Sequence, residues 1–153
     1  MEFFTRMAIV WPERLAGYFA PFGPLAARLV VGWVFVWSGW TKLHNLPKMI
    51  ENFREWGIPH PEVLTPFVSG VEFFGGLLLL LGLFTRIAAV PLIVVMIVAI
   101  ASAKWDQADS LETLLGFEET AYMALFGWLA IAGPGAFSLD HLLKRWYGSK
   151  AQA

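Results

Sequence analysis

The chain of 153 residues contains no cysteine. This absence excludes disulfide bonds, thiolate ligands for zinc or iron–sulfur clusters, and catalysis by a thiol of this chain. Charge is also scarce, since Asp, Glu, Lys and Arg make up 15% of the residues and the net charge is −1. No basic run is longer than Lys144-Arg145, which argues against nucleic acid as a partner. Sulfur or redox chemistry at this protein therefore needs a reactive group that another molecule supplies.

Histidine is scarce as well, and its spacing does not suggest a metal site. His44, His60 and His141 fall in or beside predicted loops at dissimilar depths, without the close spacing that metal or haem ligands show. We therefore predict neither a metal nor a covalently bound cofactor.

Hydrophobic residues, by contrast, make up 58% of the chain, and the mean hydropathy is +0.60. Soluble domains average about 45–50% apolar residues. Apolar segments close to the ~20 residues that cross a ~30 Å hydrocarbon core occur at about 25–43, 63–83, 87–103 and 117–131. The sequence thus predicts an all-α integral membrane protein with one domain over residues 1–153, a four-transmembrane-helix bundle with short interfacial helices.

The connections between these segments differ in length and character. Thr85-Arg86 is nearly the whole link between the second and third segments, which makes those helices antiparallel neighbours. Apolar residues recur at helical spacing within the connection 44–62 and predict a surface helix. We interpret residues 1–23 as an interfacial lead-in, 104–116 as an acidic loop and 137–147 as a second interfacial helix.

Lys and Arg predict the orientation, because short cytoplasmic loops carry an excess of these residues. Four crossings put both termini on one side. That side carries six positive charges, namely Arg6, Arg14, Arg86, Lys144, Arg145 and Lys150. The other side carries four, namely Lys42, Lys48, Arg54 and Lys104. The count predicts that the N and C termini are cytoplasmic.

Glu72 is a lone carboxylate within the apolar segment 63–83. On membrane-insertion scales, placing a comparable charged residue at the centre of a transmembrane helix costs about 2.5–3.5 kcal/mol of free energy. Glu72 shares a helix face with Thr65, Ser69 and Gly76, and small or hydroxyl side chains let a neighbouring helix approach closely. We therefore predict that Glu72 points into the bundle.

The first segment presents a small, cationic face that can meet this acid. Gly39 and Lys42 recur on that face, with Ser38 beside it. The first two segments are antiparallel and each Cβ tilts toward its own N-terminus, so Lys42 and Glu72 lean toward each other across roughly 10 Å. We predict a Lys42–Glu72 pair, direct or through one water.

Each of these residues also has a structural interpretation, which the sequence leaves open. Lys42 can snorkel to the headgroups, as lysines at span ends do. Glu72 can hold two helices together, as a structural staple, through a hydrogen bond to Ser38 or to a backbone carbonyl. We interpret Arg28, one turn inside the inner boundary, as a snorkelling anchor.

Tyr122 completes the set of candidate site residues. It follows Glu118 and Glu119 at the outer start of the fourth segment, where it can join the neighbourhood of Glu72 and Lys104. The two acids would also suit the N-terminal dipole of a helix without any function.

A series of short motifs gives the sequence a family resemblance. They are Gly32-Trp33 with Phe35, Ser38-Gly39 with Lys42-Leu43, Gly57-Ile58-Pro59, Glu72 before Gly75-Gly76, and Leu81-Gly82-Leu83 with Thr85-Arg86-Ala88-Ala89. In order and spacing these motifs resemble the DoxX family over roughly residues 24–103. The resemblance implies a four-helix protein of the bacterial inner membrane. Ser38, Lys42 and Glu72 match the family's polar signature, and the resemblance supplies no catalytic motif.

The resemblance also implies a redox setting, because the family is named for a small membrane subunit type found with thiosulfate:quinone oxidoreductase. Our first hypothesis is an accessory or anchoring subunit of a redox complex, with the lipid bilayer and a protein as partners. The second is a quinone-linked oxidoreductase subunit, in which a quinone headgroup contacts Trp37, Trp40 and Tyr122. The third is a small proton-linked carrier that uses Glu72. The small-residue faces would also permit a homo-oligomer.

Overall fold

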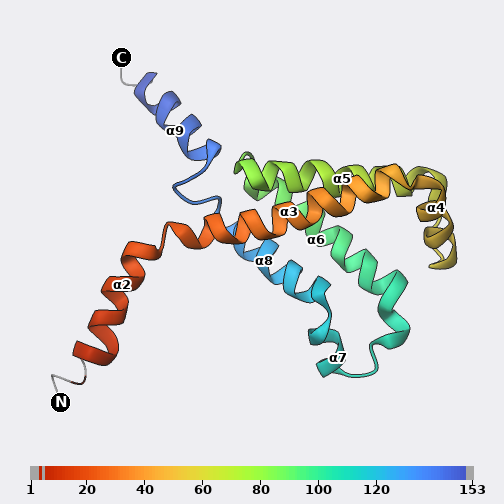
Figure 1. Ribbon diagram of the computed structural model, residues 1–153, viewed down its shortest axis with the longest axis horizontal. Coiled ribbons are helices and arrows are strands. Elements are labelled where there is room, and N and C mark those ends of the chain that lie inside the picture. Colours follow the sequence, from red (N-terminus) through yellow and green to blue (C-terminus); the bar gives the residue numbers. More distant parts are fainter. Residues whose placement is uncertain (1–3, 5, 151–153) are drawn as a thin grey trace.

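The computed structural model describes residues 4 and 6–150, and these fold into helices joined by short connections (Figure 1). Within these described residues, three helices are long and apolar enough to cross a membrane. They are α3 (Phe22–His44), α5 (Pro61–Leu81) and a third that comprises α6 (Thr85–Ala99), the π-helix η2 (Ile100–Lys104) and the 3-10 helix η3 (Trp105–Gln107). The predicted all-α membrane fold is confirmed, with helix starts two or three residues before those predicted.

Helix α8 (Glu118–Ala132) occupies the fourth predicted segment and packs against α6. Its 15 residues rise about 22 Å at ~1.5 Å per residue, which is less than the ~30 Å of a hydrocarbon core. Length and composition therefore support three crossings directly, and the fourth crossing stays a prediction.

Glycines bring α3 and α5 into backbone contact along their length. A Cβ at Gly39 would lie 2.4 Å from the backbone nitrogen of Phe73, and one at Gly76 would lie 2.6 Å from that of Val36. No larger residue fits at either position without moving a helix. The small faces predicted for these two segments are thus the faces that meet.

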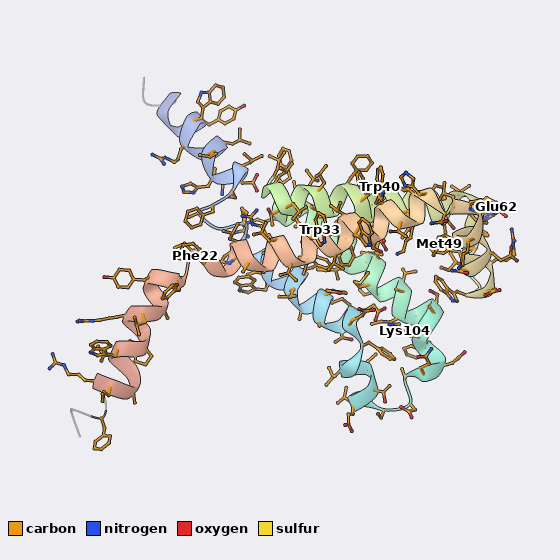
Figure 2. The ribbon with its side chains drawn as sticks, viewed as in Figure 1. Phe22, Trp33, Trp40, Met49, Glu62 and Lys104 are labelled. Carbon is orange, nitrogen blue, oxygen red and sulfur yellow. The ribbon has the colours of Figure 1, made fainter. Side chains whose placement is uncertain are left out.

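The bundle interior is aromatic and aliphatic. Phe35 of α3 packs edge-on against Phe126 and Tyr122 of α8, at centroid distances of 4.9 and 5.4 Å. Leu79 of α5 and Leu92 of α6 are fully buried in the same cluster. Many large apolar side chains point outward instead, which is the arrangement expected of a bundle that faces lipid (Figure 2).

Arginines satisfy the carbonyls at the C-terminal ends of two helices. Arg28 is 1% exposed and donates to the carbonyls of Leu79 and Leu80, 3.1 and 3.3 Å away, at the end of α5, and also to Phe137. Arg86 donates to the last carbonyls of α8, including Ile131 at 2.6 Å. The interpretation of Arg28 as a snorkelling anchor is therefore wrong. The last carbonyls of a helix lack intrahelical partners, and Arg28 supplies one from inside the bundle.

The segment after α8 closes the same end of the bundle. Asp140, in α9 (Leu139–Lys150), accepts hydrogen bonds from the backbone nitrogens of Phe84 and Thr85, 2.9 and 3.3 Å away, where α6 begins. Gly82 ends α5 with a φ of 65°, and a Cβ there would meet the Arg28 guanidinium. The helix predicted over 137–147 is thus observed as α9, tied to the bundle through its first turn, and its location at the membrane interface stays a prediction.

Shorter helices occupy the other connections. The surface helix predicted within 44–62 is α4 (Leu46–Glu55), which buries Phe53 against the bundle. Residues 104–116 are not a plain acidic loop, because they contain η3 and the short helix α7 (Leu111–Gly116), whose N-cap is Ser110. Figure 1 shows α4 and α7 at the end of the bundle far from both termini.

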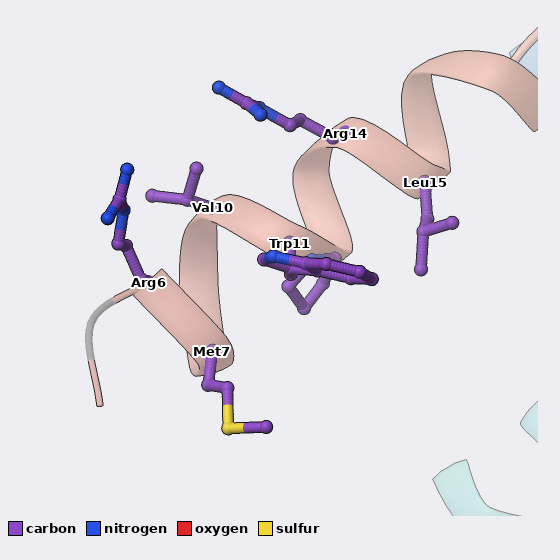
Figure 3. A pocket seen from close by; sticks show the side chains of 7 residues that line it. Arg6, Met7, Val10, Trp11, Arg14 and Leu15 are labelled. Atoms are coloured by element: carbon purple, nitrogen blue, oxygen red, sulfur yellow. The ribbon is translucent and has the colours of Figure 1, made fainter. Parts of the chain in front are cut away.

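The N-terminal lead-in is helical too, as η1 (Arg6–Val10) and α2 (Trp11–Phe19). Its described residues line a shallow hollow, in which Arg6 and Arg14 point to one side of the helix and Met7 and Leu15 to the other (Figure 3). All residues of α2 are exposed. An amphipathic helix of this kind suits the membrane interface.

Candidate functional site

The buried acid of α5 is held by two residues of α3. Lys42 Nζ lies 2.6 Å from each carboxylate oxygen of Glu72, and Ser38 Oγ donates to Oε2 at 3.0 Å. Glu72 is 2% exposed, whereas the Lys42 side chain remains 26% exposed. The predicted pair is therefore present and direct. The close approach at Gly39 brings the two helices near enough for both contacts.

The pair opens onto a cavity of about 280 Å³ whose lining is largely apolar but includes the charged side chains of the site, and we call it the polar cavity. The four residues predicted to form the polar site, Ser38, Lys42, Glu72 and Tyr122, all line this cavity. The remaining lining comes from α3, α6, η2 and α8 and from Trp56, which follows α4. These residues are Val34, Phe35, Trp56, Met96, Ala99, Ala103, Lys104, Glu118 and Glu119.

A second ion pair lines the same cavity. Lys104 Nζ, at the end of η2, lies 2.7 and 2.8 Å from the two carboxylate oxygens of Glu119 in the first turn of α8. Glu118 lies farther from this ammonium, at 3.9 Å, and the Phe117 ring centroid lies 5.3 Å from it. The predicted neighbourhood of Tyr122, Glu72 and Lys104 is thus assembled around one space.

An apolar groove of about 370 Å³ runs along the other side of the first pair. Most of its lining comes from the apolar faces of α5 and α6, for example Val68, Val71 and Val94. Lys42, Glu72, Trp56 and Ala99 line both the groove and the polar cavity. The ion pair therefore stands at the boundary between a polar chamber and an apolar one.

The tryptophans of the site are not those expected from the sequence. Trp37 and Trp40 are 62% and 47% exposed and line neither of these two spaces, and Trp40 packs instead against His44 and Phe73. Trp56 lines both spaces. The sequence feature that could have identified Trp56 as a site residue is its position at the end of an amphipathic helix, just before Gly57-Ile58-Pro59. Contact of Trp37 and Trp40 with a quinone stays a prediction.

The chemistry of this arrangement is acid–base and hydrogen-bonding chemistry. Three carboxylates, two ammonium groups, a hydroxyl and a phenol surround one small chamber, and these groups can exchange hydrogen bonds or protons with a bound molecule. Within residues 4 and 6–150, no three His, Asp or Glu side chains come together in a way that could hold a metal ion.

Comparison with known proteins agrees with this architecture. Residues 23–105 match the DoxX family. Inner membrane protein YqjF of Escherichia coli is 30% identical over 125 residues, 81% of this chain and 95% of the relative. An uncharacterized membrane protein of Mycobacterium tuberculosis is 35% identical over 146 residues, 88% of this chain and 89% of the relative. Inner membrane protein YphA of Escherichia coli is 30% identical over 121 residues, 76% of this chain and 86% of the relative. No solved structure is significantly similar.

Proposed function

The chain belongs to the DoxX family of integral membrane proteins, and we propose that it is an accessory subunit of a redox complex that holds a quinone headgroup at the Lys42–Glu72 pair. The names of the two Escherichia coli relatives support a location in the bacterial inner membrane. Redox-active quinones reside in such membranes, so ligand and site share one compartment.

The observation that carries the proposal is the position of the ion pair between two unlike chambers. A membrane quinone has a polar ring bearing oxygens and a long apolar tail. The polar cavity offers hydrogen-bond donors and acceptors to the ring oxygens, and the groove offers an apolar surface against which the tail can pack. The described residues of the site therefore complement both halves of one amphipathic molecule.

In this role the chain positions the quinone and exchanges protons with it, and a partner protein supplies the electrons. Lys42 can donate to a quinone oxygen, and Glu72 can accept a proton from a quinol hydroxyl. The chain has no cysteine that could act as a redox centre. An accessory subunit that holds the quinone beside a redox partner is consistent with both facts.

Ligand binding by the purified protein tests the proposal. A short-tailed quinol such as decylbenzoquinol would be titrated anaerobically into the protein in detergent, with heat as the readout. We expect binding to wild type and a roughly ten- to hundredfold loss in Glu72→Gln and Lys42→Met, because a hydrogen bond to a charged group contributes about 1.5–3 kcal/mol. Glu55→Gln, an exposed acid of α4, is the matched control and should bind as wild type does. Equal affinity in all four proteins would refute a site at this pair.

A further inference from the structure

The proposed contact at Lys42 and Glu72 leaves the second ion pair of the chamber without a role. Glu119 is 9% exposed, and both of its carboxylate oxygens lie within 2.8 Å of Lys104. Burial of two charges costs several kcal/mol per ion, which their mutual attraction only partly returns. Two such pairs facing one cavity of about 280 Å³ are a costly arrangement for packing alone.

Local structure at Lys104 differs from an ordinary helix end. The third long helix changes from α to π geometry over Ile100–Lys104, and Lys104 is the last residue of this π-helix. A π-helical turn inserts an extra residue, re-aims the side chains after it, and occurs frequently at functional sites. Here the side chain at the end of the π-turn is the one that reaches Glu119 and the chamber.

The two pairs come from different helices and present separate carboxylates. Lys42 and Glu72 join α3 to α5, whereas Lys104 and Glu119 join η2 to α8. With Glu118 included, the chamber is lined by three acids and two lysines. An excess of carboxylate disfavours an anionic ligand and favours a neutral molecule that donates hydrogen bonds.

We propose that the chamber binds the reduced form of a para-quinone by both ends, with one hydroxyl donating to Glu72 and the other to Glu119. This inference rests on the proposed function and specifies that the reduced form of the quinone is the form that binds. Each carboxylate accepts the hydroxyl hydrogen, and the paired lysine donates to the hydroxyl oxygen. The tail leaves the chamber beside Trp56, which also lines the apolar groove.

The size of the chamber agrees with a single ring. Pockets for drug-sized ligands run from about 300 to 1,000 Å³, and this chamber lies just below that range. A chamber of this volume suits one ring with its two oxygens, and the tail then occupies the separate groove. A ligand with one hydroxyl can donate a hydrogen bond to only one of the two carboxylates.

The test compares two probes. One is decylbenzoquinol, and the other is its monomethyl ether, in which one of the two hydroxyls is methylated. Both would be titrated anaerobically into the full-length protein in detergent, with Glu119→Gln and Lys104→Met as variants. Glu112→Gln, an exposed acid on the nearby helix α7, is the control. Wild type should bind the quinol at least about tenfold more tightly than the ether, since one hydrogen bond to a charged group is lost.

The preference between probes separates recognition from a structural role. In Glu119→Gln the quinol should lose about tenfold in affinity while the ether keeps its affinity, so that the preference disappears; Glu112→Gln should keep it. Equal losses for both probes would show that the Lys104–Glu119 pair only supports the fold, and would overturn the inference.

The same data keep this inference distinct from the proposed function. Quinol binding that depends on Glu72, with no preference over the ether in wild type, would overturn the two-ended contact and leave the proposed function standing. No binding of either probe to wild type would overturn both.

Discussion

At the scale of single residues, Glu72 satisfies both interpretations that its sequence position allows. It joins two helices through Lys42 and Ser38, as a structural staple would. It also faces two cavities, as a staple does not need to. The two cavities beside Glu72 are what the proposed quinone site requires, and they support that proposal.

Coupling between Lys42 and Glu72 is measurable by a double-mutant cycle. Lys42→Met leaves a carboxylate that is 2% exposed without its cation, and Glu72→Gln leaves the ammonium without its anion. Because breaking a buried pair from either side removes the same interaction, the losses in stability should not add, and we expect a coupling of about 1–3 kcal/mol. Thermal unfolding in detergent of wild type, both single variants and the double variant measures it. Strictly additive losses would contradict the coupling.

At the scale of elements, the sequence predicted contacts that depend on helix faces. The small faces of segments 25–43 and 63–83 follow from residue spacing, and α3 and α5 do meet through Gly39 and Gly76. Lys42 and Glu72 could be paired from sequence because the antiparallel order and the tilt of Cβ fix their directions. Periodicity is a local property, so it predicts what one helix presents to the next.

Contacts between segments that lie far apart in the sequence could not be predicted from helical spacing. Arg28 is buried because Phe137, more than 100 positions later, brings an acceptor to the same end of the bundle. Trp56 reaches the site because α4 folds back and buries Phe53. The sequence gives the chemistry of these side chains, but their partners depend on the path of a loop, which no helical period encodes.

The α3–α5 contact itself yields a steric prediction. Gly39→Ala would place a Cβ 2.4 Å from the Phe73 nitrogen and 2.7 Å from the Ser69 carbonyl oxygen, so the helices must separate. Overpacking of this kind costs roughly 1–3 kcal/mol. Gly70→Ala, on α5, is the control, because a Cβ there meets nothing within 4 Å and alanine favours the helix. Melting temperatures in detergent should fall for Gly39→Ala alone, and an equal fall in both variants would refute the close contact.

At the scale of the whole molecule, basic residues distinguish the two ends of the bundle. Helices α2 and α9, which carry Arg14, Lys144 and Arg145, extend from one end, and α4 and α7 lie at the other (Figure 1). Arg86 lies at the same end as α2 and α9, where it holds the last carbonyls of α8. Basic residues are therefore concentrated at the end that the sequence predicts to be cytoplasmic.

Whether both termini share that side depends on α8, the short fourth helix. Its 15 residues are fewer than the ~20 of a usual crossing, but a short helix can cross where the bilayer thins around it. Arg86 and Tyr122 hold its two ends against the longer helices, through the hydrogen bond to Ile131 and the ring contact with Phe35. These contacts align α8 with the bundle, so we expect it to cross and to return the chain to the cytoplasm.

A chain without cysteine allows this topology to be measured directly with single cysteines. Gly17→Cys in α2, Lys48→Cys in α4, Gln107→Cys in η3 and Gly148→Cys in α9 all lie at exposed positions. With four crossings and cytoplasmic termini, a maleimide that cannot cross membranes should label intact spheroplasts at positions 48 and 107, and at 17 and 148 only after lysis. Labelling of positions 107 and 148 together from outside, with 17 protected, would mean that α8 does not cross. The protein would then have three crossings, and α9 would lie on the outer surface.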